Sequence, residues 1–174
     1  MFPACRDDAR SLLAPLGAPP HLLLHVELVG EAADLLIALF QKHGVPVDDD
    51  FVRAGVVLHD AGKIEHPQEL FGPGSEHEPG GERLLLAAGV APALARVCLS
   101  HARWREMSVT LEELVIALAD KLWKGVRAPD LEERVVAEAA ARLGRARWDL
   151  FVPFDSCFED IAEHGHERLE RSRT

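Results

Sequence analysis

The sequence has little cysteine, and its cysteines are not spaced to bind zinc or to build a disulfide framework. Cys5, Cys98 and Cys157 are the only three, they lie far apart in the chain, and no CxxC pair occurs. Disulfide-rich secreted domains and thiolate zinc sites both need paired or closely spaced cysteines. The cysteine content is therefore typical of a protein from a reducing compartment.

A long apolar run is also missing. The first eight residues do not place a basic segment ahead of an apolar one, and no stretch of about 18 apolar residues follows. We therefore expect a cytoplasmic protein that does not bind a membrane.

Basic residues are outnumbered. The chain has 19 Lys and Arg against 29 Asp and Glu, which gives a formal net charge of −10. Binding to the backbone of long DNA or RNA depends on a broad basic surface, so long nucleic acid is not an expected partner. A small phosphorylated ligand is compatible with this charge, because local cations can reverse the field inside one pocket. The sequence predicts no oligomeric state.

The rest of the composition is that of a globular domain. The 174 residues are 48% hydrophobic and 28% charged, which is enough for one domain, residues 1–174, with its own core. Helical spacing of apolar residues dominates, and alternating runs bounded by hairpin turns are absent. The sequence therefore predicts an all-α bundle.

Breaking and capping residues divide the chain into predicted helices. Gly44 and Gly62 are expected to end two of them, and Thr110 with Glu113 forms a capping box ahead of another. Residues 64–78 are rich in proline and glycine and are predicted to form a loop over the mouth of a site. The predicted helices cover residues 6–16, 21–43, 51–60, 79–88, 92–103, 111–124 and 129–144, and the segment from residue 148 onward.

The run His59-Asp60-Ala61-Gly62-Lys63 directly follows the apolar residues 55–58. Ionisable side chains are rarely left in such surroundings without a partner or a metal. Neighbouring residues on a helix point about 100° apart, so His59 and Asp60 can share an ion only if it lies beside the helix and other segments complete its shell. The alternative is a structural His–Asp pair.

Three further histidines stand where a bundle could turn them toward this pair. His25 and His101 each extend an apolar helical stripe, although each could also be a hydrogen-bonded core histidine. His21, one turn before His25, is the alternative to His25. His77 lies at a predicted transition from loop to helix, where an exposed position is the alternative.

Asp120 is a further candidate. Simple periodicity places it opposite the apolar stripe of its helix, where it would be solvated. However, Ile116, Ala117, Ala119 and Trp123 surround it with apolar neighbours, which predicts a buried position. A buried carboxylate needs a metal or a cation.

Together these imidazoles and carboxylates form a mixed nitrogen and oxygen donor set. Such a set suits Fe, Mn, Co, Ni or Zn rather than an all-oxygen calcium site. The order of the candidates along the chain resembles that of the HD-domain superfamily of metal-dependent phosphohydrolases, over residues 21–124. The candidates that carry the resemblance are His25, His59, Asp60, His77, His101 and Asp120.

The resemblance implies a compact HD-domain helical bundle, to which residues 130–170 add a helical extension. It implies that His25, His59, Asp60 and Asp120 hold one divalent ion. The extra histidines, His77 and His101, match those of binuclear members, in which Asp60 would bridge two ions.

The implied activity is hydrolysis of a phosphoester or phosphoanhydride bond by metal-activated water, with Asp60 and Lys63 as catalytic residues. The substrate would be a small phosphorylated metabolite, a nucleotide or a dinucleotide, as in the similar bacterial hydrolases of symmetrical dinucleoside tetraphosphates. No base-specific motif is visible, and aromatic residues total only 6%.

Lys63 completes an HDxGK pattern similar to that of the HD-GYP cyclic dinucleotide phosphodiesterases, although the GYP signature is missing. The resemblance implies that Lys63 contacts phosphate. The alternative is that it complements a helix carboxyl terminus. Weaker candidates for phosphate binding, which surface ion pairs explain equally well, are Arg83, Arg103, Arg105 and Lys121.

Two other functions fit the same order of ligands. One is a mixed-valent di-iron oxygenase that resembles myo-inositol oxygenase, which shares this helical fold. The other is a non-enzymatic sensor that binds a metal and a nucleotide. Oxygen consumption, phosphate release and nucleotide binding without turnover would distinguish the three.

Overall fold

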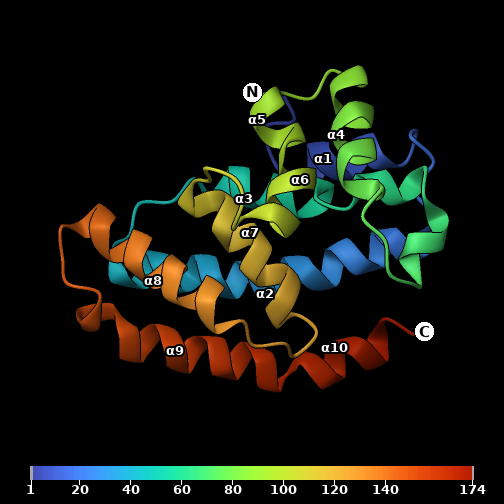
Figure 1. The fold of residues 1–174 in the computed structure, drawn as a ribbon. Coiled ribbons are helices and arrows are strands. Elements are labelled where there is room, and N and C mark those ends of the chain that lie inside the picture. Colours follow the sequence, from blue (N-terminus) through green and yellow to red (C-terminus); the bar gives the residue numbers. More distant parts are fainter. Residues whose placement is uncertain (1, 174) are drawn as a thin grey trace.

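The computed structural model describes residues 2–173, and within them every regular element is a helix or a 3-10 turn. The predicted all-α fold is therefore confirmed (Figure 1). The elements are α1 (Arg6–Leu13), α2 (Pro20–His43), α3 (Asp49–Leu58), η1 (Ala61–Ile64), η2 (Pro67–Leu70), α4 (His77–Ala87), α5 (Pro92–Ala95), α6 (Val97–Arg103), α7 (Leu111–Leu122), α8 (Pro129–Leu143), α9 (Trp148–Glu163) and α10 (Gly165–Arg171).

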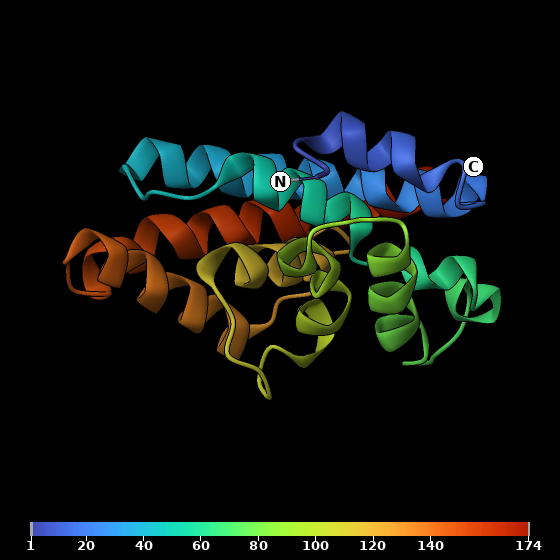
Figure 2. The same cartoon turned by 90° about the horizontal axis from the view of Figure 1, so that it is seen from above.

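The centre of the fold is formed by α2, α3 and α7, which pack against one another. On one side α8 and α9 cover this centre, and α9 runs beside α2 along the length of the molecule (Figure 2). On the other side α4 packs on η1 and α6. The core includes Phe40 of α2 and Phe154 of α9, both fully buried, with ring centroids 5.5 Å apart. Each such ring stabilises the fold by about 1.5–3 kcal/mol through its removal from water.

The ends of α2 and α3 place the HD run. Gly44 ends α2 in the left-handed conformation, with φ of 69°, as predicted. The Asp48 carboxylate accepts a hydrogen bond from the Phe51 amide and caps the start of α3. This helix ends at Leu58, two residues before the predicted end. His59 and Asp60 therefore directly follow the carboxyl end of the helix.

Gly62 was predicted to end a helix, but the structure gives it a different role. It lies inside η1, and a Cβ atom added there would stand 1.8 Å from the His77 carbonyl oxygen and 2.6 Å from the Gly81 nitrogen. Only glycine permits this close approach. The contact between η1 and α4 brings Asp60 next to His77.

The segment from residue 64 to residue 78 is more regular than the predicted loop. It contains η2, and α4 begins at His77, two residues before the predicted start. The helix predicted over residues 92–103 is two helices that meet at Arg96, and the final predicted helix divides at His164 into α9 and α10.

The capping box that opens α7 is confirmed. The Thr110 hydroxyl accepts from the Glu113 amide at 3.3 Å, and the Glu113 carboxylate accepts from the Thr110 amide at 2.9 Å. This cap begins the helix that carries Asp120. Among the described residues, no helix is both long and apolar enough to cross a membrane.

Candidate metal centre

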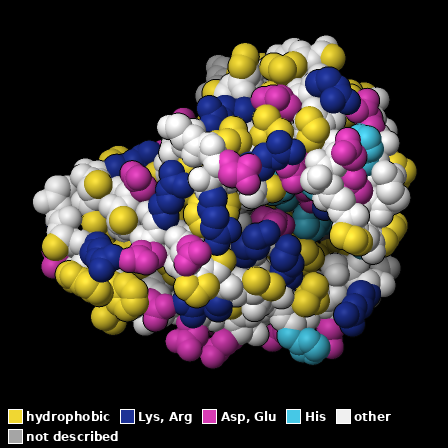
Figure 3. Space-filling model, viewed as in Figure 1, with side chains coloured by type: hydrophobic (Ala, Val, Ile, Leu, Met, Phe, Trp, Pro, Cys, Tyr) yellow, Lys and Arg dark blue, Asp and Glu magenta, His cyan; other side chains and the backbone are white. Residues whose placement is uncertain are grey.

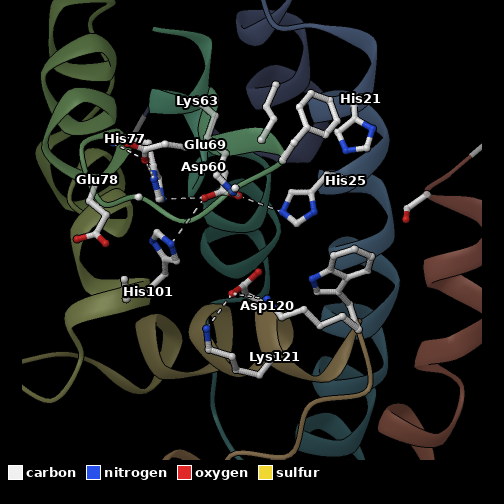
Figure 4. Close-up of a pocket in the computed structure, with 18 residues that line it drawn as sticks. His21, His25, Asp60, Lys63, Glu69, His77, Glu78, His101, Asp120 and Lys121 are labelled. Atoms are coloured by element: carbon white, nitrogen blue, oxygen red, sulfur yellow. Dashed lines mark hydrogen bonds and ion pairs between the residues drawn. The ribbon is translucent and has the colours of Figure 1, made fainter. Parts of the chain in front are cut away.

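The six predicted ligand residues converge from five parts of the chain on one point of the fold, and Figure 4 shows five of them, all except the fully buried His59. Five of their side chains are buried, and the His25 side chain is 14% exposed. They come from α2 (His25), the end of α3 (His59 and Asp60), the start of α4 (His77), α6 (His101) and α7 (Asp120).

Asp60 occupies the middle of this group. Its Oδ2 atom lies 3.1 Å from the Nε2 of His25 and 3.6 Å from the Nε2 of His59. Its Oδ1 atom lies 3.3 Å from the Nε2 of His77 and 3.7 Å from the Nε2 of His101. The two oxygens of one carboxylate thus face two different pairs of imidazoles.

The donor atoms form two groups that could each hold an ion. One group joins His25, His59 and Asp120, and the other joins Asp60, His77 and His101, with the donor atoms of each group within 4.8 Å of one another. Because Asp60 Oδ2 also faces the first group, its carboxylate is placed to contact ions in both groups.

Backbone carbonyl groups orient two of the imidazoles. The Nδ1 atoms of His59 and His101 lie 2.7 Å and 3.0 Å from the carbonyl oxygens of Val56 and Val97. A carbonyl can only accept, so each Nδ1 carries a proton and each Nε2 faces the centre, where the neutral imidazole offers a lone pair to a metal. The Nε2 of His59 is buried without a hydrogen-bond partner. Such an atom fits a metal ion, since an unpaired buried polar group is otherwise costly.

Glu69 fixes His77 in the same way, and sequence reasoning missed it. Its carboxylate accepts from the amides of Glu76 and His77, both at 3.2 Å, and lies 2.5 Å from His77 Nδ1. Glu69 is buried although it lies in the segment predicted as a loop. No local pattern marks it, because its partners lie seven and eight residues further along the chain.

The electrostatics of the cluster favour the ligand forms of its carboxylates and of His101. At His59 and His77 the neighbouring carboxylates outweigh burial and raise the pKa, so a metal ion would displace a proton from these two imidazoles. Burial raises the pKa of Asp60, but the surrounding imidazoles outweigh burial and hold this pKa well below its ordinary value. The pKa of Asp120 is likewise low, since His59 and Lys124 outweigh burial. Burial and the neighbouring His59 lower the pKa of His101 to about 4. At neutral pH the carboxylates are therefore ionised and His101 is neutral, as metal binding requires.

A cavity of about 520 Å³ opens over the cluster. Figure 3 shows histidine inside a hollow of the surface, with Lys and Arg side chains beside it. The cavity wall includes Lys63, whose Nζ lies 2.6 Å from Asp60 Oδ2. It also includes Lys121 and Lys124, whose Nζ atoms lie 3.3 Å and 3.5 Å from Asp120 Oδ2. Sequence reasoning missed Lys124. It lies four residues after Asp120, and on a helix this spacing predicts an ion pair between the two side chains.

The three arginines named as weaker candidates do not line the cavity. Arg83 is exposed on α4. Arg103 pairs with Glu78 at 2.5 Å, and Arg105 pairs with Asp130 at 3.0 Å and lies over the Trp104 ring. Surface ion pairs, the alternative explanation, therefore describe Arg103 and Arg105.

His21, the alternative to His25, lies outside both donor groups. It lines the mouth of the cavity, where its ring stands 4.9 Å from that of Phe71. His25 lies deeper, with its ring 5.0 Å from Trp123 in an edge contact. His25, which lies deeper in the helical pattern, is therefore the histidine that joins the cluster.

His77→Ala is expected to lower the metal content toward one ion per chain, because the donors of the other group stay in place. Glu69→Gln, which keeps His77 but weakens its support, should weaken binding of that ion about 10- to 100-fold. Elemental analysis of the purified protein measures both effects. His166→Ala, on an exposed histidine of α10, is the control. Unchanged stoichiometry in His77→Ala would remove His77 from the donor set.

Comparison with known proteins agrees with this geometry. The family model of the HD domain matches residues 24–139, which include all six donors and Glu69. No curated protein and no solved structure matches the chain significantly. The match covers more than half of the sequence and ends inside α8. The chain therefore belongs to the HD domain family, whose members are mostly metal-dependent hydrolases of the phosphohydrolase superfamily.

Proposed function

We propose that the protein is a cytoplasmic metal-dependent phosphohydrolase that cleaves a phosphoester or phosphoanhydride bond of a small metabolite, with nucleotides and dinucleotides as its substrate class. The observation that carries this proposal is the position of Asp60 between two groups of donors, directly beneath a cavity whose wall holds three lysines. Three of the four lysines in the sequence line this cavity, where their charge would favour a phosphate group.

Two divalent ions fit the donors. His25, His59 and Asp120 would hold one of them, His77 and His101 the other, and Asp60 would contact both. Fe, Mn, Co, Ni or Zn suits such imidazole and carboxylate ligands. When bound, the ions lower the pKa of water and neutralise charge on the phosphoryl group.

The protein itself positions the substrate and supplies charge. Lys63 stands beside Asp60, and Lys121 and Lys124 stand beside Asp120, so ammonium groups approach the cluster from two sides. Figure 4 places Lys63 and Lys121 on opposite sides of Asp60 and Asp120. A phosphate held between them would lie over the donors, and its equatorial oxygens would find positive charge on both sides.

Water is the expected nucleophile because the nearest cysteine is unsuited to the task. Cys98 is fully buried, and its thiol donates to the Leu58 carbonyl oxygen at 3.2 Å. Burial raises the pKa of this thiol far above neutrality, and the thiolate is the reactive form. Hydrolysis therefore needs no covalent intermediate on this side chain.

Release of inorganic phosphate from a panel of nucleotides, dinucleotides and sugar phosphates, with Mn²⁺ or Co²⁺ added, tests the proposal. We expect turnover that disappears with a chelator and returns with metal. Oxygen consumption by the iron-loaded protein without phosphate release would instead establish an oxygenase. Tight nucleotide binding without any turnover would establish a sensor.

Lys63→Ala should lower kcat/KM about 10- to 100-fold, the effect expected for one hydrogen bond to a charged group. The metal content should persist, because Lys63 is not a donor to the ions. Steady-state kinetics and elemental analysis of the same samples measure the two quantities. Lys42→Ala, on the exposed carboxyl end of α2, is the control. Loss of metal from Lys63→Ala would contradict the role given to Lys63.

A further inference from the structure

We propose that His21 and Phe71 form an aromatic surface that binds the planar base of the substrate. The site would then select nucleotides over phosphate esters that lack a ring. This inference extends the proposed function, on which it rests, by assigning residues to recognition of the base.

Phe71 is unusually exposed for its position. Its relative exposure is 78%, and it follows η2 in the segment that borders the cavity. A single exposed hydrophobic residue needs no explanation on its own. Here, however, the ring contacts the His21 ring at 4.9 Å with an interplanar angle of 40°, and both side chains line the same cavity. The pair leaves apolar ring surface open toward the space where a substrate would lie.

The distance from this surface to the metal centre suits a nucleotide. His21 lies four residues before His25 on α2, so the two side chains share a face and are separated by about 6 Å along the helix axis. Figure 4 shows the His21 ring beyond His25, on the side away from Asp120. A phosphate over the metal donors and a base on the His21 and Phe71 rings would thus be separated by roughly the span of one pentose.

Two of the three cavity lysines lie on the side of the donor cluster away from His21. Lys121 and Lys124 both contact Asp120 Oδ2, and Lys63 stands beside Asp60, in the middle of the cluster. The positive charge of the cavity therefore surrounds the donors, whereas the His21 and Phe71 rings lie to one side of them. A base joined through a sugar to phosphate has the matching order of groups.

The test compares adenosine 5′-monophosphate with ribose 5-phosphate, which carries the same phosphate and sugar without the base. Titration calorimetry in Mn²⁺ measures the affinity for each. We expect the wild-type protein to bind the nucleotide at least about tenfold more tightly, the effect of one base–aromatic stack. Phe71→Ala should remove most of this preference without changing the affinity for ribose 5-phosphate, and Phe71→Trp should restore it.

Two further variants complete the test. His21→Ala should reduce the preference for the nucleotide as Phe71→Ala does, and Phe151→Ala, on a partly exposed phenylalanine of α9, should not. Equal wild-type affinity for the two ligands, or a preference that survives Phe71→Ala, would overturn the inference. A preference for the nucleotide in a protein that hydrolyses no phosphate compound would overturn the proposed function and leave the aromatic surface in place.

Discussion

Asp60→Ala is expected to abolish metal-dependent turnover, with a fall in kcat/KM of about a thousandfold or more, because this carboxylate faces both groups of donors and would neutralise the charge of an ion in either. Each of its oxygens faces a different pair of imidazoles, at distances from 3.1 Å to 3.7 Å. The metal content should fall in the same variant, since His77 and His101 alone would leave the charge of an ion in their group uncompensated. Phosphate release and elemental analysis measure the two effects.

The matched controls separate loss of the ligand from loss of the fold. Asp60→Asn keeps the shape of the side chain and removes its charge, so it should be folded and nearly as inactive as Asp60→Ala. Asp130→Ala removes an exposed carboxylate that pairs with Arg105, and it should leave metal content and turnover unchanged. Full activity with an unchanged number of ions in Asp60→Ala would show that the reaction does not depend on this cluster.

The donors could be predicted because most of them obey the helical pattern. His25 and His101 extend apolar stripes, and both are found at the cluster. Asp120 is the instructive exception, since periodicity alone placed it in solvent whereas the structure leaves it only 7% exposed. It is buried because α7 is covered on several sides by α2, α3, α6 and α8. In the sequence, the apolar residues next to Asp120 indicate that it is buried.

The supporting residues could not be predicted, because their roles depend on contacts between elements. Glu69 reaches His77 only through the η2 turn. Gly62 matters for its approach to the α4 backbone, not for ending a helix. The partner of Arg103 is Glu78, which lies 25 residues away on another helix. Sequence periodicity describes one helix at a time, so it finds inward-facing donors more readily than it finds what holds them.

Removal of the metal ions should lower the melting temperature by roughly 10 °C. The fold assembles the donors from separate elements, so the ions bind the native state and not the unfolded chain. An ion present at about 1,000 times its Kd stabilises the native state by about 4 kcal/mol, and in a chain of this size each kcal/mol corresponds to about 2–4 °C. Thermal unfolding followed by circular dichroism, with Mn²⁺ and then with excess chelator, measures the shift.

The Asp60→Ala variant makes this thermal measurement specific to the cluster. If the ions stabilise the fold through these donors, chelator should lower the melting temperature of the variant far less than that of the wild-type protein, and added Mn²⁺ should raise it little. His166→Ala keeps every donor, so its shift should equal that of the wild-type protein. A wild-type melting temperature that does not respond to chelator or Mn²⁺ would mean that these buried imidazoles and carboxylates are stable without an ion. In that case the cluster would be a hydrogen-bonded core network, and the hydrolytic mechanism would lose its source of activated water.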